Sequence, residues 1–183
     1  MTTDDLESRL RDLADRSEIV DCLTRYARGM DRQDRDLVRS AYHDDAIDDH
    51  IGFVGRVDDF IDWAFGFHAS QVRHQHYLTN HTIDLDGDVA HVETYYLFVA
   101  TVPDDAAPLS ATGGRYVDRF ERRDGRWAIA ARLCVVEWMS ELRSLLDTPS
   151  VEFLALAGTM SRDRSDASYQ RPFVLDRAWH VAP

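Results

Sequence analysis

The sequence predicts an α+β fold in which N-terminal helices and one further helix wrap a curved, mostly antiparallel sheet. Three features indicate this class. Apolar residues recur at helical spacing near the start of the chain, long β-branched and aromatic runs fill its second half, and Asp-Gly pairs at 86–87 and 124–125 join those runs as hairpins. A curved sheet covered by helices encloses a cone-shaped cavity, which is a natural site for a small molecule.

The composition is that of one ordinary globular domain. The chain has 183 residues, of which 44% are hydrophobic and 30% charged, so residues 1–183 fit a single domain. The net charge of −12 argues against nucleic acid and against an anionic membrane as partners. No apolar run approaches the ~20 residues of a membrane span, and the acidic start does not resemble a signal peptide. Cys22 and Cys134 lack metal or redox spacing, so we expect buried thiols in a cytoplasmic protein.

The N-terminal part reads as two helices. The first runs from Thr3, as its cap, to about Arg28, and Gly29 is a plausible stop that places Asp31 just beyond the helix. Its buried side comprises Leu6, Leu10, Leu13, Ile19, Leu23 and Tyr26. A second helix is expected from about Asp34 to Tyr42, and residues 43–45 then read as a turn.

The rest of the chain is expected to form strands, with one helix between the first and the second of them. We expect a strand over 46–54 ended by Gly55, a helix over 57–69, and long strands over 72–80, 89–102, 111–122 and 127–138. Residues 103–108 form a polar loop, and 141–146 suit a further helical turn. The last stretch, from Arg162, wraps over the domain or over a neighbouring subunit because it carries Phe173, Val174, Leu175 and Trp179.

The strand over 72–80 is unusually rich in histidine. Because side chains alternate along a strand, His74, His76, Leu78 and Asn80 point to one side. Two imidazoles and an amide on one face suit either a pocket in which protons move or a solvated sheet face.

Five segments carry a resemblance to a known family. They are Leu23 to Asp31, Gln75-His76-Tyr77 with Asn80, and residues 86–90, 114–120 and 124–127. In these the chain resembles the nuclear-transport-factor-2-like superfamily, in particular its SnoaL-like and scytalone-dehydratase-like members. The resemblance covers a core of about residues 6–138, followed by an extension of about 139–183, and it implies a cone-shaped α+β barrel that forms a homodimer or homotrimer.

The resemblance also implies an acid–base pair. It falls on Asp31 and His76, and Tyr26 matches the Tyr-x4-Asp spacing of bile-acid-type dehydratases in this family. The chain departs from scytalone dehydratase at Met30, at Asp49 and near Gly113, where that enzyme has two tyrosines and a second catalytic histidine. A carboxylate held against an imidazole fixes its tautomer and makes it a proton acceptor, which suits syn elimination without any cofactor.

Further side chains are candidates for binding the substrate. They are Asp49, His50, His74, Asn80, Arg115, Tyr116 and Trp138. Each candidate also has a structural explanation: Asp31 suits a helix cap, His76 a satisfied wall histidine, Tyr26 and Tyr116 core packing, and Arg115 a cross-strand ion pair. His74 and His76 with Asp48 and His50 resemble metal ligands, but no further ligand follows at a completing distance, so we expect no metal.

Three functions fit these features. The leading hypothesis is a cofactor-independent lyase, a dehydratase acting on a small aromatic, polyketide or steroid-like substrate, with His76 as base and acid, Asp31 as its partner and Tyr26 as hydrogen-bond donor. The second is an isomerase or cyclase that uses the same pair. The third is a non-catalytic binding or assembly subunit, like the small subunits of ring-hydroxylating oxygenases.

Overall fold

The computed structural model describes residues 2–101, 109–142, 161–172 and 174, and it confirms the α+β class. The elements in chain order are α1 (Thr3–Arg32), α2 (Arg35–Arg39), β1 (Tyr42–His50), β2 (Phe53–Arg56), α3 (Val57–Ala69), β3 (Arg73–Asp86), β4 (Val89–Thr101), β5 (Leu109–Arg123), β6 (Arg126–Leu142) and a 3₁₀ turn (Ala167–Tyr169). The expected helix over 57–69 is therefore confirmed to the residue. Among the described residues, no helix combines the length and apolar character needed to cross a bilayer.

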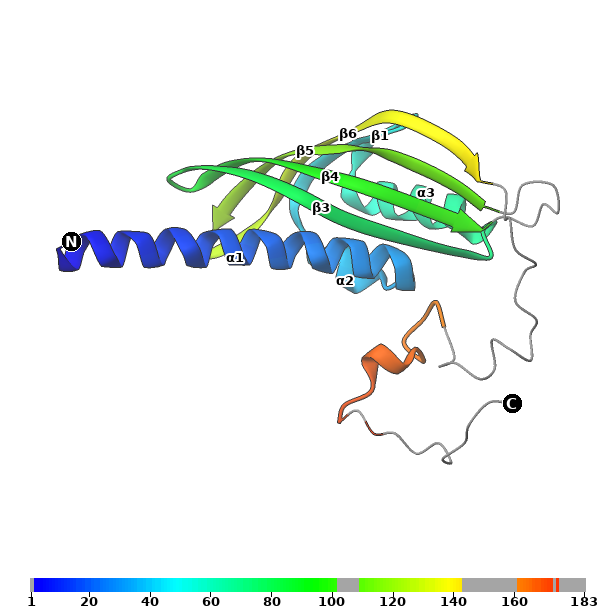
Figure 1. Ribbon diagram of the computed structural model, residues 1–183, viewed down its shortest axis with the longest axis horizontal. Helices are drawn as coiled ribbons and strands as arrows, with labels where there is room; N and C mark the ends of the chain where they lie inside the picture. Colours follow the sequence, from blue (N-terminus) through cyan, green and yellow to red (C-terminus); the bar gives the residue numbers. More distant parts are fainter. Residues whose placement is uncertain (1, 102–108, 143–160, 173, 175–183) are drawn as a thin grey trace.

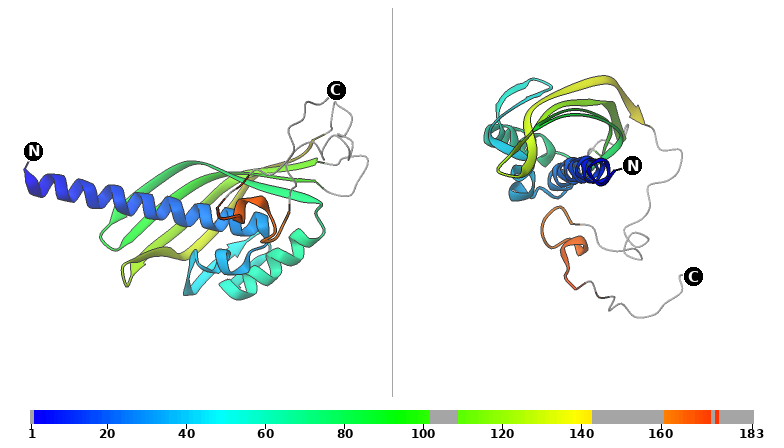
Figure 2. Two further views of the ribbon diagram at one scale, coloured as in Figure 1. Left: turned by 90° about the horizontal axis from the view of Figure 1, so that it is seen from below. Right: turned by 90° about the vertical axis from the view of Figure 1, so that its left-hand side faces the viewer.

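One curved sheet organises the molecule, with strand order β2-β1-β6-β5-β4-β3. Every neighbouring pair is antiparallel except β1 and β6, which run parallel. Helices α1 and α3 lie against the hollow side of the sheet (Figures 1 and 2). The two Asp-Gly turns join β3 to β4 and β5 to β6, and both glycines take the positive φ that such hairpins need. The largest fully buried side chains are Trp127, Tyr26, Tyr42, Tyr116, Phe60 and Phe120.

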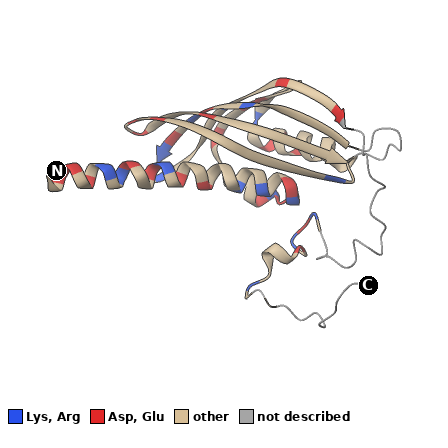
Figure 3. Ribbon diagram, in the orientation of Figure 1, with Lys and Arg blue, Asp and Glu red and all other residues tan. Residues whose placement is uncertain are grey.

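Helix α1 is longer and less buried than expected. Thr2, rather than Thr3, caps it, since its hydroxyl accepts from the Asp5 backbone while the Asp5 carboxylate accepts from the Thr2 backbone. The first turns project past the sheet, with acidic and basic side chains along them (Figures 1 and 3). Leu6, Leu10 and Leu13 are therefore 44–63% exposed, and the expectation that they are buried is wrong. Burial begins at Ile19, where the helix reaches the sheet.

Gly29 does not end helix α1. A β-carbon at this glycine would lie 2.7 Å from the backbone nitrogen of Val38, so Gly29 allows α2 to pack directly on α1. The helix continues to Arg32 and stops at Gln33, which adopts the left-handed conformation. Asp31 consequently lies in the last helical turn, not beyond it.

The segment after α1 also differs from expectation. Helix α2 spans only Arg35–Arg39, and residues 43–45 belong to strand β1 instead of a turn. A turn at Ile51 and Gly52, both with positive φ, separates β1 from β2, so Gly55 lies inside β2. The stretch 46–54, which was expected to be one strand, is thus divided between the two strands of a hairpin.

The C-terminal part is described for residues 161–172 and 174. Glu141 lies in strand β6, not in a helical turn, while residues 103–108, 143–160, Phe173, Leu175 and Trp179 lie outside the described residues. Arg162 donates to the backbone carbonyls of His68 and Gln71 at the end of α3. Tyr169 and Arg164 bind the Asp34 carboxylate, which caps α2. This segment therefore contacts both helical regions beside the sheet.

Candidate active site

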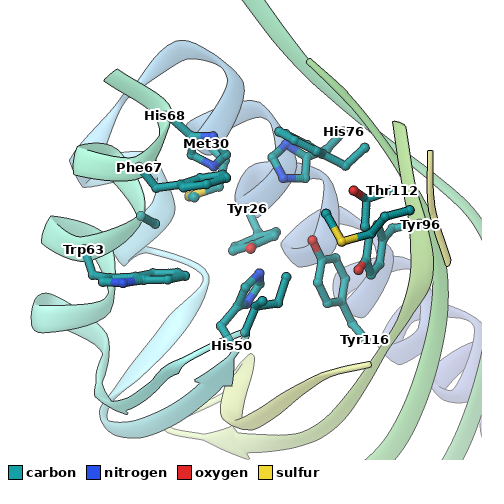
Figure 4. A pocket seen from close by; sticks show the side chains of 14 residues that line it. Tyr26, Met30, His50, Trp63, Phe67, His68, His76, Tyr96, Thr112 and Tyr116 are labelled. Carbon is teal, nitrogen blue, oxygen red and sulfur yellow. The ribbon is translucent and has the colours of Figure 1, made fainter. Parts of the chain in front are cut away.

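A cavity of about 260 Å³ lies between the hollow face of the sheet and helices α1 and α3. Figure 4 shows side chains from several elements converging on it. Its walls are mainly apolar and aromatic; they include Tyr26, Met30, His50, Trp63, Phe67, His68, His76, Tyr96, Phe98, Thr112, Tyr116 and Met139. An apolar cavity with a few convergent polar groups is the usual form of a small-molecule site.

His76 lines this cavity, and Asp31, which lines a neighbouring pocket, contacts His76 from behind. Helix α1 delivers the carboxylate in its last turn, and β3, the edge strand of the sheet, delivers the imidazole from near its first residues. His76 Nδ1 lies 2.7 Å from Asp31 Oδ1, and the backbone N–H of His76 donates to the same carboxylate at 3.1 and 3.2 Å. The carboxylate therefore receives the proton of Nδ1 and leaves the lone pair of Nε2 available. Only 5% of the His76 side chain and 15% of the Asp31 side chain are exposed.

Tyr26 places a hydroxyl group without a partner in the cavity wall. Its side chain is fully buried, and its oxygen makes no hydrogen bond within the described residues. Burial raises the pKa of Tyr26 above its ordinary value, so the phenol stays protonated and can donate. The guanidinium of Arg132, ion-paired with buried Asp118, lies 4.2 Å from the Tyr26 ring centroid. Such a cation on the ring face stabilises negative charge on the phenol, and this makes its O–H a stronger hydrogen-bond donor.

A second Asp–His pair forms the opposite wall. His50 Nδ1 lies 3.2 Å from Asp48 Oδ1, and the Tyr42 hydroxyl donates to Asp48 Oδ2 at 2.6 Å. Burial by itself lowers the pKa of His50, but the Asp48 carboxylate, with a contribution from Cys134, outweighs burial and raises it to about 9. His50 is consequently a cation at neutral pH and can donate to an oxygen in the cavity.

Two further histidines remain neutral on the α1 side. His74 Nε2 lies 3.0 Å from the Met30 carbonyl, and burial lowers the pKa of His74 to about 4. His68, from the last turn of α3, stacks on His74 with ring centroids 4.1 Å apart. Burial, followed by the neighbouring His74, lowers the pKa of His68 to about 3. His74 thus supports the wall from behind, and His68 faces the cavity.

Tyr116 is the one further candidate that lines the cavity; Asn80, Asp49, Arg115 and Trp138 do not. The alternation along β3 breaks at a bulge between Leu78 and His81, so Asn80 is exposed and His81 takes its inward place, 3.1 Å from the Thr94 hydroxyl. Asp49 is exposed because Asp48 and His50, its neighbours on β1, point inward.

Arg115 and Trp138 lie on the outer face of the sheet. Arg115 binds the carboxylates of Glu93 and Glu137 on the adjoining strands. It therefore forms the cross-strand ion pair that was its structural explanation, and it does not face the cavity. Trp138 covers Gly113, whose β-carbon would lie 2.3 Å from the indole. A register shift between Gly113 and Gly114 accompanies this placement, and Met139, not Trp138, reaches the cavity.

Sequence reasoning missed His68, Met139 and Thr112 as cavity residues. His68 carried a usable signal, because it follows Phe60, Ile61 and Ala64 on the same helical face. For metals, no group of three or more His, Cys, Asp or Glu side chains among the described residues is arranged to hold an ion.

The family is established by sequence. A model of the SnoaL-like domain matches residues 11–133, about two thirds of the chain, so this protein belongs to the SnoaL-like family. Among curated proteins, none matches the sequence.

Solved structures show the same fold. Hexachlorocyclohexane dehydrochlorinase LinA-type3 from Novosphingobium barchaimii is 20% identical, with a TM-score of 0.69, over 78% of this chain and 99% of the other. A protein from Novosphingobium aromaticivorans with the provisional name scytalone dehydratase is 17% identical, with a TM-score of 0.64, over 73% and 91%. A protein from Kribbella flavida, Kfla4162, is 18% identical, with a TM-score of 0.65, over 70% and 95%. At these identities the likeness concerns the fold.

Proposed function

We propose that this protein is a cofactor-independent lyase that eliminates water, or another small neutral molecule, from a small aromatic substrate. The observation that carries the proposal is His76 in the wall of an apolar cavity, held by Asp31 behind it at 2.7 Å, with Nε2 unpaired within the described residues. Two of the similar structures have names that denote elimination, a dehydrochlorinase and a provisional dehydratase, which supports this reaction class.

The proposed reaction is a proton abstraction followed by loss of a hydroxyl group. His76 Nε2 takes a proton from the carbon beside a carbonyl, and Asp31 stabilises the imidazolium that forms. The electrons of the broken C–H bond form the new C=C bond as the C–O bond breaks. His76 then returns the proton to the departing hydroxyl, which leaves as water.

Two donors in the cavity suit the negative charge that develops on the carbonyl oxygen. Tyr26 offers a phenolic O–H without another partner, and His50 offers an N–H from a cationic ring. Donors fixed in advance in an apolar site stabilise such an oxyanion more strongly than water does. The reaction as proposed needs no cofactor.

The size of the cavity favours a small substrate. A volume of about 260 Å³ lies below the range of roughly 300–1,000 Å³ typical of pockets for drug-sized ligands. Trp63 and Phe67 from α3, stacked with an interplanar angle of 9°, together with Phe98 from β4, suit a flat ring. We therefore favour a substrate with one or two rings over a tetracyclic steroid.

Turnover of one- and two-ring aromatic β-hydroxy ketones, followed by mass spectrometry, tests the proposal. The expected product is lighter by one water, and Asp31→Asn abolishes most of its formation. Asp49→Asn is the matched control, because it makes the same chemical change on an exposed side chain outside the cavity.

Other outcomes separate the rival functions. A product of unchanged mass that takes up solvent deuterium would indicate an isomerase or cyclase. Tight binding without turnover, unaffected by Asp31→Asn, would indicate a non-catalytic binding subunit and overturn the proposal. The homodimer or homotrimer expected from the resemblance stays a prediction that light scattering of the purified chain can test.

A further inference from the structure

His68 is held in one tautomer at the wall of the cavity. Its Nδ1 lies 2.9 Å from the side-chain oxygen of Gln71, which can only accept, so Nδ1 carries the proton. Nε2 is then the acceptor, and it has no hydrogen-bond partner among the residues that the structure describes. Figure 4 shows the ring at the cavity wall, near His76 and Met30.

The surroundings keep this ring neutral. Burial, then the stacked ring of His74, lowers the pKa of His68 to about 3, although Gln71 opposes this shift. The ring therefore accepts hydrogen bonds over the whole physiological range and does not exchange protons there. It differs from His50 across the cavity, which is cationic and can only donate.

A purely structural role explains this arrangement poorly. Phe67 and Phe98 pack against the ring, so a phenylalanine would serve the packing equally well and would present no hydrogen-bond acceptor to an apolar cavity. The chain instead fixes the ring from behind, with Gln71 on Nδ1 and Arg162 on the His68 and Gln71 carbonyls. Such support is typical of a side chain whose orientation matters to a ligand.

We propose that His68 is a specificity-determining residue whose Nε2 accepts a hydrogen bond from a hydroxyl group on the ligand, which makes hydroxylated one- or two-ring aromatic compounds the preferred substrate class. This inference rests on the proposed function in placing the substrate in the same cavity. The rings of His68 and His76 have centroids 5.8 Å apart. A one- or two-ring ligand can therefore contact both imidazoles at once.

Binding of p-cresol and p-xylene to the full chain tests the inference. The two probes have nearly the same shape and differ in one hydroxyl, so the ratio of their Kd values from ligand-observed NMR isolates its recognition. In His68→Phe we expect the preference for p-cresol to fall about 3- to 10-fold relative to wild type. In His68→Gln, whose side-chain oxygen can reach the position of Nε2, we expect most of the preference to remain.

His43→Phe is the matched control, because His43 is also a buried histidine but binds the Glu121 carbonyl away from the cavity. An unchanged preference in His68→Phe would overturn the inference. A preference lost in Asp31→Asn but kept in His68→Phe would also overturn it, since the hydroxyl would then bind the Asp31–His76 pair.

A second measurement covers the case in which His68→Phe does not fold. In wild-type protein labelled with ¹⁵N histidine, p-cresol should shift the Nε2 resonance of His68 and p-xylene should not; no shift with p-cresol would refute the inference. Neither measurement requires turnover. Loss of the hydroxyl preference in His68→Phe together with failure of every substrate in the panel would therefore refute the proposed elimination and leave this recognition standing.

Discussion

Two Asp–His pairs face each other across the cavity, and they are built in different ways. Asp48 and His50 lie two residues apart on strand β1, where strand alternation alone puts them on one face. Asp31 and His76 are 45 residues apart and meet only because the end of α1 packs on the first part of β3. The Asp48 side chain is fully buried, whereas 15% of the Asp31 side chain is exposed.

The two carboxylates hold their histidines in different ways. Asp48 also accepts from Tyr42, so its charge has two partners, and the pKa of His50 rises to about 9. His50 thus keeps its proton at neutral pH. Asp31 instead holds His76 by its Nδ1–H and by its backbone N–H, which fixes the ring while leaving Nε2 free to take a proton. Identical functional groups therefore hold one histidine as a cation and leave the other with an open Nε2.

The largest expected effect is on turnover by the Asp31–His76 pair. We expect His76→Gln to lower kcat/KM by about 10²–10⁴-fold on a substrate found in the panel, because general acid–base help of this kind is lost. Thermal unfolding should change little. If His76→Gln keeps a near-wild-type kcat/KM, the acid–base role proposed for His76 is wrong.

The Asp48–His50 pair should have its main measurable effect on stability. Asp48→Asn leaves the His50 cation without its counter-ion in a buried site, and we expect a loss of about 3–5 kcal/mol in the free energy of unfolding. Urea denaturation measures this loss. If Asp48→Asn unfolds like wild type, the structural role of the pair is refuted.

Tyr26 sharpens the comparison because it should affect catalysis without supporting the fold. Tyr26→Phe removes a donor to the developing oxyanion, so we expect kcat to fall about 10²–10³-fold. The hydroxyl has no partner within the described residues, and its removal should leave the free energy of unfolding equal or raise it by up to ~1 kcal/mol. Paired kinetics and urea denaturation give both numbers, and a marked loss of stability would show that the hydroxyl is already satisfied.

The pH dependence of stability is the smallest expected effect. A histidine whose folded pKa is raised stabilises the native state fully below its unfolded value of 6.5, and that contribution disappears as pH rises through about 9. We expect the stability advantage of wild type over His50→Gln to shrink by up to about 2 kcal/mol between pH 6.5 and 8. Urea denaturation at several pH values checks this, and an advantage that does not vary with pH would contradict the cationic state of His50.

Local rules in the sequence predicted much of the fold. The spacing of Phe60, Ile61 and Ala64 located α3, and the glycines at 87 and 125 located two hairpins, because these depend on short stretches of chain. Gly29 misled for a physical reason. A glycine that ends a helix and one that lets another helix approach look the same in sequence, and only the contact with Val38 distinguishes them.

The site was predictable only in part. The meeting of Asp31 and His76 was expected from the family resemblance, because no local rule links residues so far apart. Asn80 was misplaced because a bulge after Leu78 inverts the alternation, and a bulge leaves no clear mark in the residues themselves. Arg115 was misplaced because its direction depends on Glu93 and Glu137 on two other strands.

Arg162 joins the C-terminal segment 161–172 to the end of α3. Its guanidinium holds carbonyls of Gln71 and His68 that precede it by 91 and 94 positions, and nearby Tyr169 holds Asp34, just after the helix that bears Asp31. The segment from Arg162 to Tyr169 therefore links the region next to Asp31 with the end of α3, the helix that carries His68. Under the role proposed for His68, replacing Arg162 is expected to alter ligand selectivity from a position outside the cavity lining.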